Sequence, residues 1–66
     1  MKKVSFRETQ ILTLLANGES KASVAEKVGI SFETVKTHVR TIREKLGVGN
    51  TTAACAYAVS HGYISV

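Results

Sequence analysis

The stretch from Ser31 to Leu46 constrains the fold most, because its apolar and polar residues separate at the period of a helix. Its apolar residues recur at intervals of four, three and four positions: Val35, Val39, Ile42 and Leu46. They predict a helix over residues 32–46 with one apolar stripe that faces a core. Away from that stripe are long basic and small hydroxylated side chains: Lys36, Thr37, Arg40 and Arg43. Such a helix can pack on a small domain and still offer hydrogen-bond donors to a polyanion.

A shorter helix is predicted just upstream, over residues 21–28, with Ser20 as its N-cap and Gly29 after its last turn. Ala25, Gly29 and Val35 have the spacing that two steeply crossing helices need at a tight turn. The alanine lets the helices approach, the glycine adopts the positive φ of the turn, and the valine fills the angle. This pattern indicates a helix-turn-helix unit, whose second helix enters the major groove of DNA.

Two further helices are predicted towards the ends of the chain. Ser5 and Glu8 form a capping-box pattern that starts a helix over about residues 6–17. Asn50 can cap a fourth, alanine-rich helix over about residues 51–61. No proline, internal repeat or strand-like alternation interrupts this order. The expected fold is therefore all-α, with four helices.

Length and composition limit the function. With 66 residues the chain has room for a single domain over residues 1–66 and a small core, with Met1 to Val4 as a loose basic lead. Nine Lys and Arg against five Asp and Glu give a net charge of +4, which favours an anionic partner. No apolar run approaches the roughly 20 residues of a membrane span, and no signal-peptide core follows Met1. These features predict a cytoplasmic protein with no membrane partner.

The residues do not suggest an enzyme. There is no pair of carboxylates in a plausible pocket and no Gly-rich phosphate loop, and a chain of this length offers little concavity. Cys55 cannot form an internal disulfide alone, and with His38 and His61 it shows no metal-ligand spacing. We therefore expect a binding module with no cofactor, no metal and no small-molecule substrate.

A series of short elements matches one known pattern: Gly18-x-Ser20, Val24-Ala25, Gly29-Ile30-Ser31, Thr34-Val35-Lys36-x-His38-Val39, Ile42-x-x-Lys45-Leu46-x-Val48 and Asn50-x-Thr52-x-Ala54. Over about residues 4–64 the chain resembles the LuxR-type (GerE/NarL/FixJ) helix-turn-helix domain. The resemblance implies sequence-specific binding of duplex DNA, as a dimer, in a bacterial transcription regulator. It also implies that the third helix lies in the major groove and that the fourth often supplies the dimer contact.

The chain departs from the family pattern at several positions. Lys21-Ala22-Ser23 stands where the family usually has Asn-Lys-Glu, so the usual phosphate-directed lysine is displaced by one residue. Gln10 and Thr51 replace the common glutamate and arginine. The family usually carries a receiver or ligand-binding domain ahead of this one, as response regulators do. Since Met1 begins almost at the first helix, we expect either a stand-alone member or a fragment of a larger regulator.

The candidate DNA-binding residues fall into two groups. Three residues at groove-facing positions of the third helix are expected to touch base edges: Lys36, Thr37 and Arg40. The alternative is that they form a solvated face. Residues near helix starts or beside that face suit phosphates better: Ser20, Lys21, Thr34, His38 and Arg43. For His38 the rival hypothesis is a histidine satisfied inside the domain. For Lys45 a phosphate contact competes with simple stabilisation of the helix end.

The fourth helix is the candidate dimer contact. Four of its residues would let two copies approach closely on an inverted repeat: Thr52, Ala53, Ala56 and Val59. The alternative is that the alanines of this helix pack only within the monomer. A second class of function stays open, namely an adaptor that contacts RNA polymerase as the related fold in sigma factors does. An exposed apolar or acidic patch on the third helix would favour the adaptor. The sequence of that face is instead basic and hydroxylated.

Overall fold

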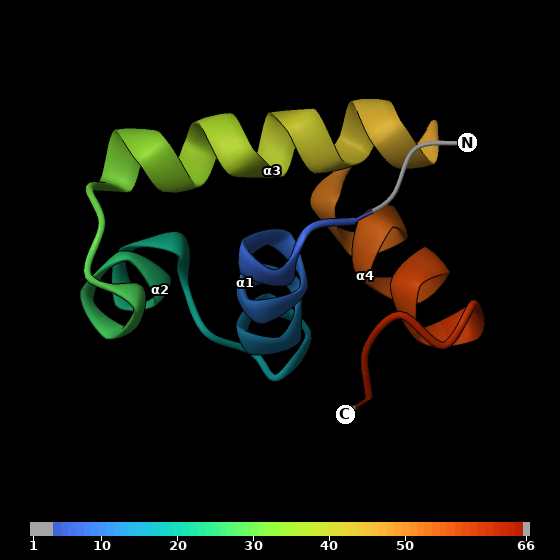
Figure 1. Cartoon of the computed structure of the whole chain (residues 1–66), viewed down its shortest axis with the longest axis horizontal. Coiled ribbons are helices and arrows are strands. Elements are labelled where there is room, and N and C mark those ends of the chain that lie inside the picture. The colour runs from blue at the N-terminus through green and yellow to red at the C-terminus, as the bar shows by residue number, and fades with distance from the viewer. Residues whose placement is uncertain (1–3, 66) are drawn as a thin grey trace.

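The computed structural model describes residues 4–65, which form four α-helices and no strand. The helices are α1 (Phe6–Ala16), α2 (Lys21–Val28), α3 (Phe32–Leu46) and α4 (Thr51–Ser60). The predicted all-α fold is therefore confirmed. Figure 1 shows α3 lying across the other three helices, with α2 under its N-terminal part, α1 in the middle and α4 under its C-terminal part. Within residues 4–65 no helix is long and apolar enough to cross a membrane.

All four helix starts are capped by a neighbouring side chain, as predicted for Ser5, Ser20 and Asn50. Ser5 accepts a hydrogen bond from the Glu8 backbone N–H, and the Glu8 side chain accepts one from the Ser5 N–H, which completes the capping box. The side chains of Ser20, Ser31 and Asn50 each accept from the backbone N–H three residues ahead. Each cap satisfies one of the free N–H groups of its first helical turn.

Two helices end one residue earlier than predicted. Asn17 is the C-cap of α1 rather than its last residue, and Gly18 follows at a φ of 94°. His61 likewise caps α4, and Gly62 follows at a φ of 74°. A glycine at positive φ turns the chain out of the helix, so the residue before it already leaves helical geometry.

The core consists of two hydrophobic clusters along the underside of α3. The first cluster joins α1, α2 and the N-terminal half of α3: Ile11, Val24, Ala25, Val35 and Val39. The second joins α1, α4, the C-terminal half of α3 and the C-terminal tail: Leu12, Ile42, Ala54, Ala58 and Ile64. The predicted apolar stripe is confirmed, since Val35, Val39 and Ile42 are buried and Leu46 packs against the second cluster.

Residues near both ends of the chain also pack in this core. Their contribution was not predicted from the sequence. Val4 packs against the second cluster, so the prediction of a loose lead is wrong at this position, and Met1 to Lys3 lie outside the described residues. Ile64 is 7% exposed in the same cluster. An isolated Val or Ile in a terminal segment shows no periodicity, so its burial depends on the surface that the helices provide.

Candidate nucleic-acid interface

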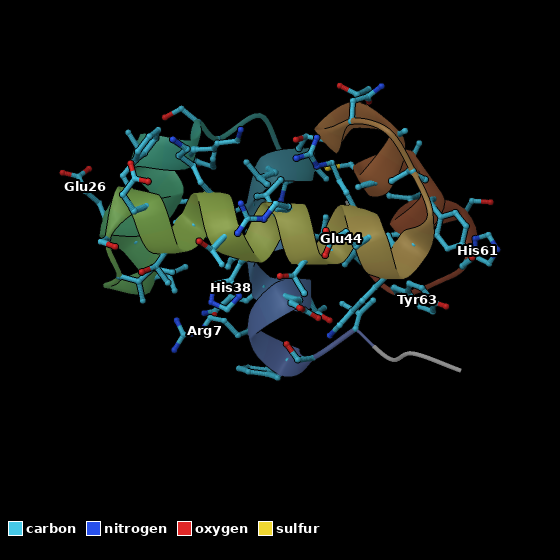
Figure 2. All side chains as sticks on the ribbon, turned by 90° about the horizontal axis from the view of Figure 1, so that it is seen from above. Arg7, Glu26, His38, Glu44, His61 and Tyr63 are labelled. Atoms are coloured by element: carbon cyan, nitrogen blue, oxygen red, sulfur yellow. The ribbon has the colours of Figure 1, made fainter. Side chains whose placement is uncertain are left out.

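The side of α3 turned away from the other helices presents the predicted base-contacting residues. Lys36, Thr37 and Arg40 are all exposed, whereas Val35 and Val39 next to them are buried. Figure 2 looks down on this side of α3, from which side chains project away from the domain. One helix therefore has a face fixed by the core and an opposite face open to a ligand.

Thr37 presents its methyl group more readily than its hydroxyl. The Thr37 Oγ1 donates to the backbone carbonyl of Glu33 at 3.1 Å, one helical turn back. This bond occupies the hydroxyl proton, as is common for threonine inside a helix. The γ-methyl then remains as the group that can meet an apolar atom, such as the methyl of thymine.

Lys36 lies among two neighbours at the start of α3. Its Nζ is 5.6 Å from the centroid of the Phe32 ring, within the range of a cation–π contact. It also lies 3.6 Å from Glu33 Oε2, and both side chains are well exposed. An exposed pair at this distance contributes little stability, so Lys36 can exchange these contacts for a ligand.

The outer face of α3 is less uniformly basic than expected. Glu33 and Glu44 are both exposed, one near each end of the helix. Figure 2 shows Glu44 on the side of α3 that faces the viewer, in the C-terminal half of the helix. The cations Lys36 and Arg40 thus occupy the middle of a face that carries a carboxylate towards each end. The two acidic residues of this face had no predicted role.

The candidate phosphate contacts of α2 lie at its N-terminus. Ser20 is exposed and caps the helix, and Lys21, its first residue, is half-buried. Glu19 accepts from Ser23 Oγ at 2.6 Å and from Lys27 Nζ at 2.7 Å. The hydrogen bonds from Lys27 and then Ser23 lower the pKa of Glu19 below its ordinary value. Glu19 therefore links the segment before α2 to two side chains of that helix.

His38 lies on the flank of α3 beside α1 in Figure 2, and Thr34 lies one helical turn before it. Thr34 is exposed, and its Oγ1 lies 2.7 Å from Ser31 Oγ. His38 is half-buried and makes no hydrogen bond within residues 4–65. Arg7 lies on the same side of α3 in Figure 2, and its Nη1 donates to the Val28 carbonyl at 3.3 Å. The phosphate contact of His38 and its alternative, a histidine satisfied inside the domain, both stay predictions.

Lys45, in the last turn of α3, points back into the domain. Lys45 Nζ lies 2.8 Å and 3.1 Å from the two carboxylate oxygens of Glu8, whose side chain is 5% exposed. Neither of the two predicted roles of Lys45 included this pair. Burial would raise the pKa of Glu8, but hydrogen bonds from Lys45 and from the Ser5 N–H outweigh it and lower the pKa. Lys45 thus neutralises a buried carboxylate across α1 and α3.

Arg43 departs from its predicted outward position. It is half-buried, and its Nη1 donates to the Gly49 carbonyl at 3.4 Å in the turn before α4. Its Nε is buried and has no hydrogen-bond partner within residues 4–65. The guanidinium is therefore directed partly at the chain itself, because the turn after α3 brings carbonyl groups back beside it.

The candidate dimer residues lie on the outer side of α4. Thr52, Ala56 and Val59 are exposed and Ala53 is half-buried. Two other alanines, Ala54 and Ala58, are fully buried against α1 and α3. The alanine-rich composition of α4 therefore serves two faces, one inside the monomer and one outside it.

This four-helix arrangement has close matches among known proteins. A family model described as bacterial regulatory proteins, luxR family, matches residues 2–58. The chain belongs to the luxR family. The response regulator VraR of Staphylococcus aureus is 45% identical to this luxR-family chain over 58 residues, which are 88% of this chain and 28% of that protein. The luxR-family chain thus spans 28% of the length of the curated relatives it matches.

Solved structures agree with this membership. The luxR-family chain superposes on transcription factor GerE with a TM-score of 0.91 and 28% identity, over 97% of both chains. It superposes on the Vibrio cholerae VqmA dimer, a LuxR-type receptor whose structure is described in the absence of target DNA, with a TM-score of 0.89 and 27% identity. That match covers 98% of this chain and 30% of VqmA. The four-helix fold, including the helix-turn-helix predicted over residues 21–46, is thus that of the luxR family.

Proposed function

We propose that this chain is the DNA-binding part of a bacterial transcription regulator and that it recognises duplex DNA by sequence. The observation that carries the proposal is the exposure of Lys36 and Arg40 on one side of α3 while its opposite side is buried in the core. In a helix-turn-helix the second helix enters the major groove, which corresponds to α3 here. The excess of basic residues over the whole chain supports an anionic partner. Such a protein acts in the bacterial cytoplasm.

The exposed residues of α3 suit the edges of bases. Lys36 and Arg40 can each donate to guanine O6 and N7, while Thr37 can place its methyl against thymine. The remaining candidates lie near helix starts or beside that face and suit phosphates: Ser20, Lys21, Thr34, His38 and Arg43. Arg43 is the weakest of them, because its guanidinium already contacts Gly49. The proposed role is binding alone, without catalysis or a cofactor.

Selection of bound duplexes from a random pool tests this function, because it yields the site, its symmetry and its spacing together. On the selected site, Lys36→Ala and Arg40→Ala should each cost about 1–3 kcal/mol, and much less on random DNA. Lys21→Ala should weaken binding to both DNAs nearly equally and reduce the salt dependence. Equal losses on both DNAs for the α3 variants would show that these residues contact phosphates rather than bases.

An adaptor that contacts RNA polymerase stays as the second candidate. An exposed apolar or acidic patch on α3 would favour it, but the two exposed carboxylates there, Glu33 and Glu44, are separated by Lys36 and Arg40. An adaptor for RNA polymerase that ignores DNA would show no binding to duplex DNA at low salt and hence no loss of binding as salt rises. The salt titration of the wild-type chain therefore separates the two candidates.

We further infer that two copies pair through α4 when bound to an inverted repeat. One recognition helix covers few base pairs, so two domains related by a two-fold axis gain affinity and specificity. The exposed Thr52, Ala56 and Val59, with Ala53 beside them, would allow two α4 helices to approach closely. This surface is small, so the chain alone should be a monomer or weak dimer in solution and pair cooperatively on DNA.

Ala56→Glu tests the pairing, because it places like charges at the centre of the proposed contact. Gel-shift titrations should show lost cooperativity on the full inverted repeat and unchanged affinity for a half-site. Circular dichroism should show unchanged helicity, since Ala56 is exposed in the monomer. Unchanged cooperative occupancy in this variant would mean that pairing arises elsewhere.

A further inference from the structure

Glu33 is an acidic residue on a surface that we expect to meet a polyanion. Its side chain is 80% exposed and lies in the first turn of α3, one turn before Thr37. A carboxylate there interacts favourably with the positive end of the helix dipole, which is one reason for its presence. The same carboxylate would be repelled by DNA phosphates, so a protein that only binds the backbone gains nothing from it.

The position of Lys36 gives Glu33 a second possible role. Lys36 Nζ and Glu33 Oε2 are 3.6 Å apart, and their side chains are 50% and 80% exposed. The Phe32 ring, 45% exposed, lies 5.6 Å from the same Nζ and restricts its position. The start of α3 therefore displays a cationic donor and an anionic acceptor side by side, on the helix proposed to enter the major groove.

A base pair shows the complementary arrangement in the major groove. Guanine O6 is an acceptor and cytosine N4 is a donor, and these two atoms bond to each other at about 2.9 Å. We propose that Glu33 and Lys36 read one G·C pair together. Lys36 donates to guanine O6, and Glu33 accepts from cytosine N4. The inference rests on the proposed function, since it requires α3 to lie in the major groove.

An A·T pair fits the same two side chains less well. It also presents a donor beside an acceptor, adenine N6 and thymine O4. However, adenine N7 would then lie beside the Glu33 carboxylate and repel it, because both are acceptors. In the G·C pair the second acceptor, guanine N7, lies on the lysine side instead, where the remaining ammonium protons can use it. The arrangement therefore selects G·C over A·T.

The test compares base preferences after selection from a random duplex pool for the wild type, Glu33→Ala, Lys36→Ala and Glu44→Ala. Glu33→Ala and Lys36→Ala should relax the preference for G·C at the same base pair, by about tenfold or more for each. Glu33→Ala should also bind random duplexes more tightly, because it removes a negative charge. Glu44→Ala removes the same charge farther along α3, so it should tighten binding to random duplexes and leave every base preference intact.

Three outcomes would overturn the inference: no change of preference in Glu33→Ala, relaxation at a different base pair from Lys36→Ala, or the same relaxation in Glu44→Ala. Thermal unfolding followed by circular dichroism should show that all variants stay folded at the assay temperature. Failure of the proposed function gives a separate result, since the wild type itself would then enrich no sequence.

Discussion

The two halves of α3 carry similar charged side chains but use them differently. In the N-terminal half Lys36 is exposed, as is Arg40 just past the midpoint of the helix, and within residues 4–65 neither contacts a buried charge. In the C-terminal half, Lys45 pairs with the buried Glu8 of α1, and Arg43 donates to Gly49. The groups that pack against each part of α3 therefore decide the role of its cations. A cation beside a buried carboxylate stabilises the domain, and one above an apolar cluster stays available to a ligand.

The physical reason is the position of Glu8. Its carboxylate completes the capping box of α1 and is buried at the junction with α3, so a cation there offsets the cost of desolvating its charge. No buried carboxylate lies beneath the N-terminal half of α3 within residues 4–65, where the buried neighbours are apolar.

Val35→Asp should unfold the domain. Val35 is 0% exposed between α2 and α3, and an unpaired carboxylate in the first cluster costs more than the roughly 5 kcal/mol that stabilises a small domain. Thr37→Asp is the matched control, since the same charge at an exposed position of the same helix should leave the fold intact. Helical circular dichroism retained at full strength in Val35→Asp would contradict our placement of the core.

Lys45→Met should lower the free energy of unfolding by about 2–3 kcal/mol, because it leaves the Glu8 carboxylate buried without its cation. Lys36→Met removes an exposed pair at 3.6 Å and should change stability by less than about 0.5 kcal/mol. Urea denaturation of both variants measures the contrast between the two halves of α3. Equal effects would show that the pair with Glu8 contributes no more than an exposed one.

Gly29→Ala should cost about 1–2 kcal/mol, because Gly29 ends α2 at a φ of 80°, a conformation that residues with a Cβ adopt only with strain. No atom lies within 4 Å of a Cβ added at Gly29, so the cost comes from the backbone alone. Gly49→Ala is the control, since its φ is not positive and the space around it is also open. Similar thermal midpoints for the two variants would show that the turn before α3 does not depend on this conformation.

Acid should weaken the wild type through Glu8. The pKa of Glu8 is lowered in the folded chain, so its stabilising contribution is complete above the ordinary value of 4.5 and is lost as pH falls below it. In Lys45→Met the burial of Glu8 still raises its pKa, but the hydrogen bond and charge of Lys45 no longer lower it. The loss of stability in acid should therefore shrink or reverse. Urea denaturation of the wild type and of Lys45→Met between pH 6 and pH 3 measures this effect. The difference between their urea midpoints should decrease as pH falls. Parallel pH curves would exclude Glu8 as the source of the dependence.

Much of the fold follows from local signals in the sequence. The four helix starts carry side chains that cap their own first turns, and α3 has a hydrophobic period strong enough to place its buried face. These features depend on residues within a few positions of one another, so they can be recognised without the tertiary structure. The exposure of Lys36, Thr37 and Arg40 follows in the same way, as the side of α3 opposite the stripe.

The rest depends on which helices meet. The pair of Lys45 with Glu8 joins residues 37 positions apart, and Val4 and Ile64 come from opposite ends of the chain into one cluster. The sequence by itself determined the helices, their caps and the amphipathic character of α3, because these are local properties. Only the tertiary structure decided that Lys45 turns inward and pairs with the buried Glu8, because the role of a charged side chain depends on the charge and burial of the groups that pack against it.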